Sequence, residues 1–239
     1  MKLGVISDIH ANLHALEAAL ALLAAEQVDE LIVLGDLLSY GCHPREVLKL
    51  MRDLPRQRPT TVLVGNHDQL YFEMQAGRAG YFDRMPLWIQ ESATWTLAAL
   101  GSERLEGALS WHEEHVVGDT LFAHANPFGA RDWCYLNGND DRRRAASALQ
   151  DRGFARGVFG HTHRAVDVDI DGVRLLNPGS VGQPRDGTGD ATVGMWSEQD
   201  FRTLPVTYDT SAHLAGILDS TLSRATQAEI LKYHQGARP

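Results

Sequence analysis

The sequence predicts an α/β fold with a largely parallel sheet, and two observations lead to this prediction. In the first 70 residues, apolar runs typical of buried strands alternate with helical segments in the order strand, helix, strand, helix, strand. In the second half, strand-like runs surround turn signals, as they do in hairpins. The chain has 239 residues, of which 44% are hydrophobic, which is enough for a substantial core. No linker-like or repeated stretch divides it, and we expect one domain over residues 1–239.

The first half contains the clearest strands and helices. Three apolar runs that end in polar residues predict strands: "KLGVIS" (2–7), "LIVLGD" (31–36) and "TTVLVG" (60–65). Helices are expected over "NLHALEAALALLAA" (12–25), where four leucines share a face, and over "PREVLKLMRDL" (44–54). A further helix should run from Leu87 to Leu100 and end at Gly101.

The second half is richer in strands. Hairpins are predicted at "HVVGDTLFAHA" (115–125) and around Asp171-Gly172 in "VDVDIDGVRLLNPGS" (166–180), and a further pair of strands at "ATVGMWSEQDFRTLPVTYD" (191–209). The stretch "DDRRRAASALQDRG" (140–153) should be a helix with a solvated arginine face. From about residue 211 the chain is expected to be helical, with a frayed end after Tyr233.

Charge and composition exclude several classes of protein. The net charge is −9 and no basic run extends beyond Arg142–Arg144, which argues against long nucleic acid or an anionic membrane as the main partner. No segment approaches the roughly 20 apolar residues that a membrane span needs, and the apolar N-terminal run is too short for a signal peptide. Cys42 and Cys134 are too few for a disulfide framework, so we expect reduced thiols in a cytoplasmic protein.

Polar residues of the kinds that bind metals follow five of the predicted strands. They are Asp8, His10, Asp36, Asn66, His67, Asp68, His124, His161 and His163. Open α/β sheets bind ligands beyond the carboxyl ends of their strands. Aspartates and histidines gathered there would repel one another or lack partners unless a cation joined them. The sequence therefore predicts a metal site at this edge.

The spacing of the histidines in "VFGHTH" (158–163) predicts two ions. On an extended chain, residues two positions apart point the same way, about 6.6 Å apart, and paired metals lie about 3.5–4 Å apart. His161 and His163 can then each bind one ion, and the two oxygens of Asp36 can bridge both. Oxygen and imidazole ligands without thiolate suit Mn, Fe, Zn, Co or Ni.

These residues together resemble the calcineurin-like metallophosphoesterases. The series is D-x-H (Asp8, His10), G-D (Asp36), G-N-H-D (residues 65–68), His124 after a strand, and G-H-T-H (residues 160–163); "LNPGSVGQPRDG" (176–187) further resembles the small bacterial phosphodiesterase branch. The resemblance implies a four-layer α-β-β-α sandwich of two mixed sheets flanked by helices. It implies two divalent ions, one held by Asp8, His10, Asp36 and His163, the other by Asp36, Asn66, His124 and His161. His67 would be the catalytic histidine near the leaving group, and Asp68 receives no catalytic role.

The function implied is hydrolysis of a small phosphate ester by in-line attack of a hydroxide that bridges the ions, with manganese as the preferred metal. A phosphodiesterase is favoured over a phosphomonoesterase acting on nucleotides or phosphoprotein. The stretch "GDLLSYG" lacks the Asp-Arg-Gly that the serine/threonine phosphatases of the family carry. The alternative from another functional class is a non-catalytic scaffold. The presence of a suitable residue at every ligand position argues against this alternative.

The substrate contacts are less strongly indicated. Arg185 is a candidate phosphate clamp or a surface residue, and Asn12 is a candidate substrate contact or the N-cap of the first helix. Residues 126–140 are either a substrate lid or a packed loop, and Tyr40 and His43 are expected near the pocket. The remaining histidines match no motif and are expected to be structural or exposed: His14, His112, His115, His213 and His234. The oligomeric state, a homo-oligomer included, and the natural substrate stay open.

Overall fold

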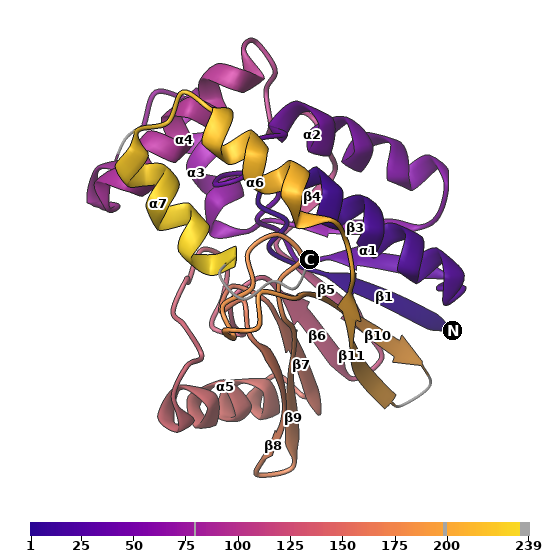
Figure 1. Cartoon of the computed structure of the whole chain (residues 1–239). Helices are drawn as coiled ribbons and strands as arrows, with labels where there is room; N and C mark the ends of the chain where they lie inside the picture. Colours follow the sequence, from indigo (N-terminus) through magenta and orange to yellow (C-terminus); the bar gives the residue numbers. More distant parts are fainter. Residues whose placement is uncertain (79, 198–199, 235–239) are drawn as a thin grey trace.

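The computed structural model describes residues 1–78, 80–197 and 200–234, which form two β-sheets with helices on their outer sides (Figure 1). The strands are β1 (Lys2–Ile6), β2 (Glu30–Val33), β3 (Thr60–Leu63), β4 (Trp111–His112), β5 (Glu114–Val117), β6 (Thr120–Ala123), β7 (Arg156–Phe159), β8 (Ala165–Ile170), β9 (Val173–Pro178), β10 (Ala191–Ser197) and β11 (Asp200–Val206). The α-helices are α1 (Leu13–Ala25), α2 (Pro44–Asp53), α3 (Asn66–Gln75), α4 (Leu87–Leu100), α5 (Asn139–Asp151), α6 (Thr210–Asp219) and α7 (Arg224–Leu231). Within these described residues, no helix combines the length and apolar character needed to cross a bilayer.

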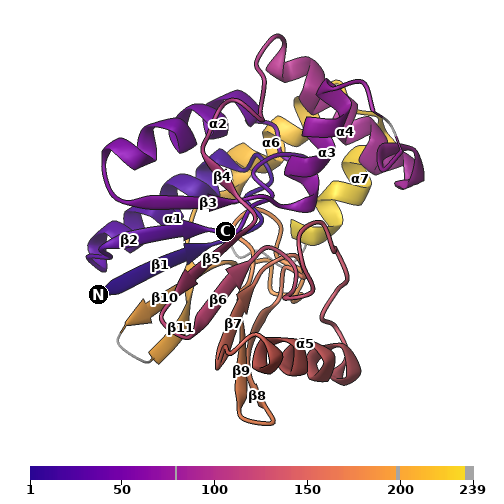
Figure 2. The ribbon, with the colours of Figure 1, turned by 180° about the vertical axis from the view of Figure 1, so that it is seen from behind.

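Both sheets are mixed, as the resemblance implied. The first has the order β11-β10-β1-β2-β3-β4, in which β1 to β4 are parallel and β10 runs antiparallel to β1. The second has the order β5-β6-β7-β9-β8, in which β6, β7 and β9 are parallel and the outer strands are antiparallel. Figure 2 shows α5 alone beside the second sheet, with the other helices gathered near the first. The four-layer prediction is therefore confirmed.

The alternation of side chains along the strands explains the layers. In β6, Phe122 packs between the two sheets, whereas Leu121 faces the cluster under α5. In β1, Leu3 and Val5 belong to the core between the sheets, and Ile6 packs toward the helices of the first sheet. Each sheet thus has two apolar faces, which is why its strands read as nearly continuous apolar runs.

Most predicted elements are confirmed, including the hairpins β5–β6 and β8–β9 and the helix from Leu87 to Leu100 with Gly101 at its end. The C-terminal helical segment differs in one respect, because it is two helices. Ser220 ends α6 and the Ser223 side chain caps the N-terminus of α7. His234 still lies in a short 3-10 helix, and the rest of the predicted frayed end falls on 235–239, outside the described residues.

Candidate metal centre

The seven predicted ligands meet beyond the carboxyl ends of β1, β2, β3, β6 and β7, and each is at most 5% exposed. Their ligand atoms form two groups in which all atoms lie within 4.8 Å of one another: Asp8, His10, Asp36 and His163 in the first, and Asp36, His124 and His161 in the second. Asn66 adjoins the second group, because its Oδ1 lies 3.1 Å from His124 Nε2. Asp36 belongs to both groups.

The backbone at these positions is not extended, which corrects the reasoning from the spacing. Strand β7 ends at Phe159, and φ is 62° at His161 and 57° at His163. Asp8 and Asp36 each have a φ of 55°. This left-handed conformation costs non-glycine residues roughly 1–3 kcal/mol each and persists where the surroundings enforce it. His161 and His163 still face different groups of ligand atoms. The reason is that the chain turns at both residues, and not that the chain is extended.

Hydrogen bonds to the backbone fix which ring nitrogen of each histidine faces the centre. A carbonyl oxygen can only accept, so the ring nitrogen beside it must donate. Nδ1 donates in three rings: from His10 to Leu38 at 3.0 Å, from His124 to Leu34 at 2.9 Å, and from His163 to Gln183 at 2.6 Å. In His161 the donor is instead Nε2, which bonds the carbonyl of Trp133 at 3.0 Å. Each neutral ring therefore presents its other nitrogen as a bare lone pair.

In the first group, acceptors face one another without a donor between them. Nε2 of His10 lies 3.2 Å from Nε2 of His163, and Asp8 Oδ1 is buried without a hydrogen-bond partner, 3.4 Å from the same His163 nitrogen. Acceptors this close are repulsive unless a cation joins them. In the second group, His124 Nε2 lies 3.5 Å from Asp36 Oδ2, where a proton on the ring or a metal ion can supply the positive charge. The donor set therefore fits metal ions.

The titration of the buried groups shows the same demand for positive charge. Burial lowers the pKa of His124, but the charge and hydrogen bond of Asp36, together with the charges of Asp8 and Asp68, outweigh burial and raise that pKa to about 9. Burial raises the pKa of the Asp8 carboxyl to about 7. Burial also lowers the pKa of His10 to about 3, so its ring is neutral and its lone pair is available. Positive charge, from a proton or from metal ions, is needed to hold both aspartates ionised.

Asp68 holds the loop that carries Asp36, a role that the sequence did not reveal. Its carboxylate accepts hydrogen bonds from the backbone N–H groups of Asp36 at 2.7 Å, Leu37 at 3.1 Å and Gly65 at 2.9 Å. The prediction for Asp68 assumed an extended chain, whereas residues 66–68 form the first turn of α3. Asp36 Oδ1 in turn accepts from the backbone N–H of His67 at 2.8 Å. The loop after β2 and the start of α3 thus fix each other.

The close approach of these two segments requires glycine at position 65. A Cβ there would lie 2.2 Å from Asp36 Oδ1 and 2.5 Å from Asp36 N. We expect Gly65→Ala to displace the Asp36 carboxylate, and since a displacement of about 1 Å can cost about 10²-fold in rate, activity should fall by that order together with metal content. Gly107→Ala, which meets no atom within 4 Å, is the matched control. Elemental analysis and steady-state rates on both variants test this, and an active, metal-replete Gly65→Ala would contradict it.

His67 stands apart from both groups, and its ring is held by two hydroxyls. Nδ1 lies 2.8 Å from Ser39 Oγ, and Nε2 lies 2.9 Å from the hydroxyl of Tyr40. The Ser39 hydroxyl also bonds that of Tyr71 at 2.7 Å. Sequence reasoning expected Tyr40 near the pocket but missed Ser39; the signal for both was their position in "GDLLSYG", just after Asp36.

The two predicted substrate contacts differ in the structure. Asn12 is fully buried and caps α1: its Oδ1 accepts from Ala15 N at 3.1 Å, and its Nδ2 donates to Gly182 O and to the Tyr208 hydroxyl. This supports the cap and leaves Asn12 no free group for substrate, which corrects that prediction. Arg185 donates to Gln183 Oε1 at 2.7 Å, while its Nε is buried without a partner in the described part of the chain. Burial and then the charge of Arg185 lower the pKa of His163, so the guanidinium acts electrostatically on the centre.

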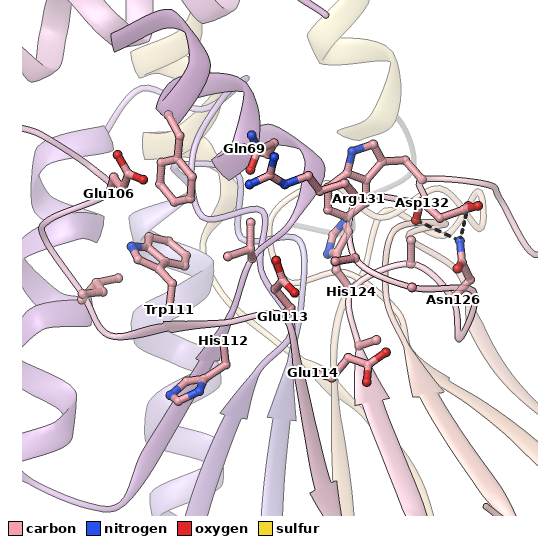
Figure 3. A pocket seen from close by; sticks show the side chains of 18 residues that line it. Gln69, Glu106, Trp111, His112, Glu113, Glu114, His124, Asn126, Arg131 and Asp132 are labelled. Carbon is pink, nitrogen blue, oxygen red and sulfur yellow. Dashed lines mark hydrogen bonds between the residues drawn. The ribbon is translucent and has the colours of Figure 1, made fainter. Parts of the chain in front are cut away.

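A cavity of about 330 Å³ opens beside His124 (Figure 3). One wall is the loop within residues 126–140, where Asn126 donates to Asp132 Oδ1 at 3.0 Å. This loop also contacts the second metal group, because the Tyr135 ring stacks on His161 with centroids 4.0 Å apart. The opposite wall comes from α3 and from residues 106–114. The loop is therefore a wall of the space next to the centre.

The comparisons with known proteins agree with this geometry. A family model for the calcineurin-like phosphoesterase superfamily domain matches residues 1–200. The chain is 32% identical over 221 residues to the uncharacterized protein MJ0912 of Methanocaldococcus jannaschii, covering 84% of each. It is 28% identical over 198 residues to the phosphodiesterase YfcE of Escherichia coli, covering 82% of this chain and 86% of that protein.

Solved structures show the same fold. A metallophosphoesterase from Sphaerobacter thermophilus superposes with a TM-score of 0.74 at 28% identity, covering 96% of this chain and 98% of the other. The hypothetical protein PH1004 of Pyrococcus horikoshii superposes with a TM-score of 0.84 at 20% identity over 99% of both chains. Because the family model matches residues 1–200 of the 239, the chain belongs to the calcineurin-like phosphoesterase superfamily and is a phosphoester hydrolase.

Proposed function

We propose that this protein is a phosphodiesterase that hydrolyses small phosphate esters with two divalent metal ions. The observation that carries the proposal is Asp36, shared by two groups of buried ligand atoms, the atoms of each group lying within 4.8 Å of one another. The ligands would be Asp8, His10, Asp36 and His163 for one ion, and Asp36, Asn66, His124 and His161 for the other. Manganese suits this set of oxygen and imidazole ligands, with Fe, Zn, Ni or Co as alternatives. Cys42 and Cys134 are unpaired, which fits a cytoplasmic enzyme.

When bound, the two ions would polarise the phosphoryl oxygens and provide a nucleophilic hydroxide at neutral pH. Only two of the ligands, Asp8 and Asp36, carry negative charge, so the loaded site keeps a net positive charge. The chain as a whole has a net charge of −9, and this centre is therefore a local focus for an anionic phosphate.

Two side chains have roles in holding and protonating the substrate. The unpartnered Nε of Arg185 can donate to a phosphate oxygen beside the His163 side of the centre. His67 is not needed as a ligand, and its ring is fixed by Ser39 and Tyr40, so it can act as the general acid for the departing oxygen. The Tyr40 hydroxyl lies where a substrate oxygen would approach Nε2, so we expect it to turn aside or share the bond.

The cavity beside His124 favours a diester. A diester carries two substituents and one negative charge, whereas a monoester carries one substituent and up to two charges. The cavity gives room for a substituent beyond the phosphate. Its lining includes one arginine, Arg131, but four carboxylates, which on balance disfavour additional negative charge: Glu106, Glu113, Glu114 and Asp132. Its aromatic residues, Phe72, Trp111 and Trp133, suit an apolar or ring-bearing substituent. The similarity to a named phosphodiesterase points the same way.

The bridging role of Asp36 predicts a difference between two variants. Asp36→Ala should lower metal content at both positions, because it removes a ligand from each. His163→Ala removes a ligand from the first group alone and should lower content at one position. Elemental analysis of the purified variants measures this, with circular dichroism to confirm folding. Two tightly held ions per chain in a folded Asp36→Ala would remove the bridging role.

A matrix of metals and substrates tests the proposed function as a whole. Protein reloaded with Mn, Fe, Co, Ni or Zn would be assayed on phosphomonoesters, linear diesters and cyclic nucleotides. We expect the highest kcat/KM on diesters with Mn²⁺. Higher values on monoesters would replace the diesterase by a phosphomonoesterase, and no turnover with any combination would favour the scaffold.

A further inference from the structure

A second cluster of metal-binding residue types lies outside the centre described above. Cys42 and His43 end the loop that begins at Asp36, and His213 lies on α6, more than 170 positions away in sequence. One ligand atom from each lies within 4.8 Å of the others. His14 and His234 flank the cluster, with ring centroids 5.0 Å from His43 and 4.9 Å from His213, respectively. The four histidines of this region have no place in the phosphoesterase motifs: His14, His43, His213 and His234.

The separations suit one tetrahedral ion. Zinc bonds of about 2.3 Å to sulfur and 2.0–2.1 Å to nitrogen place neighbouring ligand atoms about 3.4–3.6 Å apart. Cys42 Sγ lies 3.3 Å from His43 Nδ1, close to this value. Since the widest separation in the cluster is below 4.8 Å, side-chain movements of about 1 Å or less would complete the geometry.

One buried polar atom of the cluster lacks a partner among the described residues, whereas the Cys42 thiol lies 3.9 Å from the His213 carbonyl oxygen. His213 is 1% exposed, and its Nδ1 has no hydrogen-bond partner in the described residues. His43 is the N-cap residue of α2 but makes no side-chain capping bond. Burial lowers the pKa of His213 well below its ordinary value, and the neighbouring His234, His43 and His14 lower it further, so the ring is neutral and can bind a cation.

The close packing around the Cys42 thiol depends on the glycine at position 216. A Cβ on Gly216, one helical turn after His213, would lie 2.5 Å from Cys42 Sγ and 3.8 Å from His43 Cε1. The missing side chain at Gly216 is what lets the loop and α6 approach each other here. Burial and then the neighbouring His14 lower the pKa of His43, and Glu46 and Glu17 partly oppose this, so two carboxylates lie near the cluster.

We propose that Cys42, His43 and His213 bind a third metal ion of the zinc class, separate from the pair at Asp36. His14 or a water molecule completes the four ligands. The thiolate makes this site softer than the pair, so it selects zinc over manganese. An ion here links α6 to the loop that carries Asp36, Ser39 and Tyr40, and its role is to hold that loop in place.

The test uses cobalt as the probe, because a thiolate bound to Co²⁺ gives a charge-transfer absorption that oxygen and imidazole ligands do not. The full chain is stripped by chelation under reducing conditions and titrated with Co²⁺. We expect the thiolate band in the wild-type protein and its loss in Cys42→Ser and in His43→Gln. His43 is half-buried, so His43→Gln gives a second test of the band that does not depend on the folding of Cys42→Ser. Cys134→Ser is the matched control, because Cys134 is exposed and lies outside the cluster, where its backbone N–H donates to Asp132 Oδ1.

Metal content gives an independent readout. Zinc-loaded Cys42→Ser should hold one ion per chain fewer than the wild type, and its melting temperature should rise less on addition of zinc. Asp36→Ala should keep the thiolate band, which separates this site from the proposed phosphoesterase centre. A wild-type protein without the band, a band that survives in Cys42→Ser, or a band lost in Cys134→Ser would overturn the proposal.

Discussion

Removal of the metal ions should abolish hydrolysis of bis-p-nitrophenyl phosphate, and Mn²⁺ should restore it. The proposed mechanism would take its nucleophile from the metal ions, and the side chains of Ser39 and Tyr40 are each bonded to the His67 ring. Metal ions contribute several kcal/mol of transition-state stabilisation. At about 1.4 kcal/mol per factor of ten, the loss should be roughly 10³-fold or more.

The measurement is the steady-state rate before chelation, after chelation and after reloading, with metal content recorded at each stage. Cys42→Ser should respond to chelation as the wild type does, since it lacks only the proposed third site. Full activity in metal-free protein would defeat the mechanism. Recovery that requires zinc at the third site in addition to manganese would show that the two sites are coupled.

The fold and the gathering of the candidate ligands at one sheet edge could be predicted because their signals are local. Each ligand follows an apolar run by a few residues, as Asp36 follows "LIVL", and parallel strands bring such ends to one edge. His161 and His163 lie in different groups of candidate ligand atoms, although the assumed extended backbone was wrong. The position of a polar residue after a strand is thus more informative than its exact conformation.

The network around His67 could not be predicted for a physical reason. Ser39 and Tyr40 reach the His67 ring because both adopt a left-handed backbone, with φ of 80° and 67°. Non-glycine residues rarely do so, and nothing in "LLSYG" indicates it. For Asn12 the difficulty was different. An N-cap residue and a substrate contact look the same in the sequence, and only the burial and the hydrogen bonds of Asn12 distinguish them. The cluster at Cys42 joins segments that no local pattern connects.

His67→Gln should keep both metal ions but lower the rate by roughly 10²–10⁴-fold, as expected for loss of a general acid. His67 belongs to neither group of ligand atoms, so its removal leaves the ligands intact. Glutamine can still bond the hydroxyls of Ser39 and Tyr40, and the loop should keep its shape. His115→Gln is the control, because His115 lies on β5, away from the centre.

The size of the loss should depend on the leaving group. p-Nitrophenolate is a stable anion and hardly needs a proton, whereas an alkyl or ribose alkoxide needs one to depart. The variant should therefore lose far more activity on alkyl or nucleoside diesters than on p-nitrophenyl diesters, provided that the absence of a presteady-state burst shows chemistry to be rate-limiting. Equal losses on both substrates with metals retained would mean that His67 binds the phosphate and does not donate the proton. Lost metal would instead make the His67 ring a support of the centre, acting through its bonds to Ser39 and Tyr40 in the loop that follows Asp36.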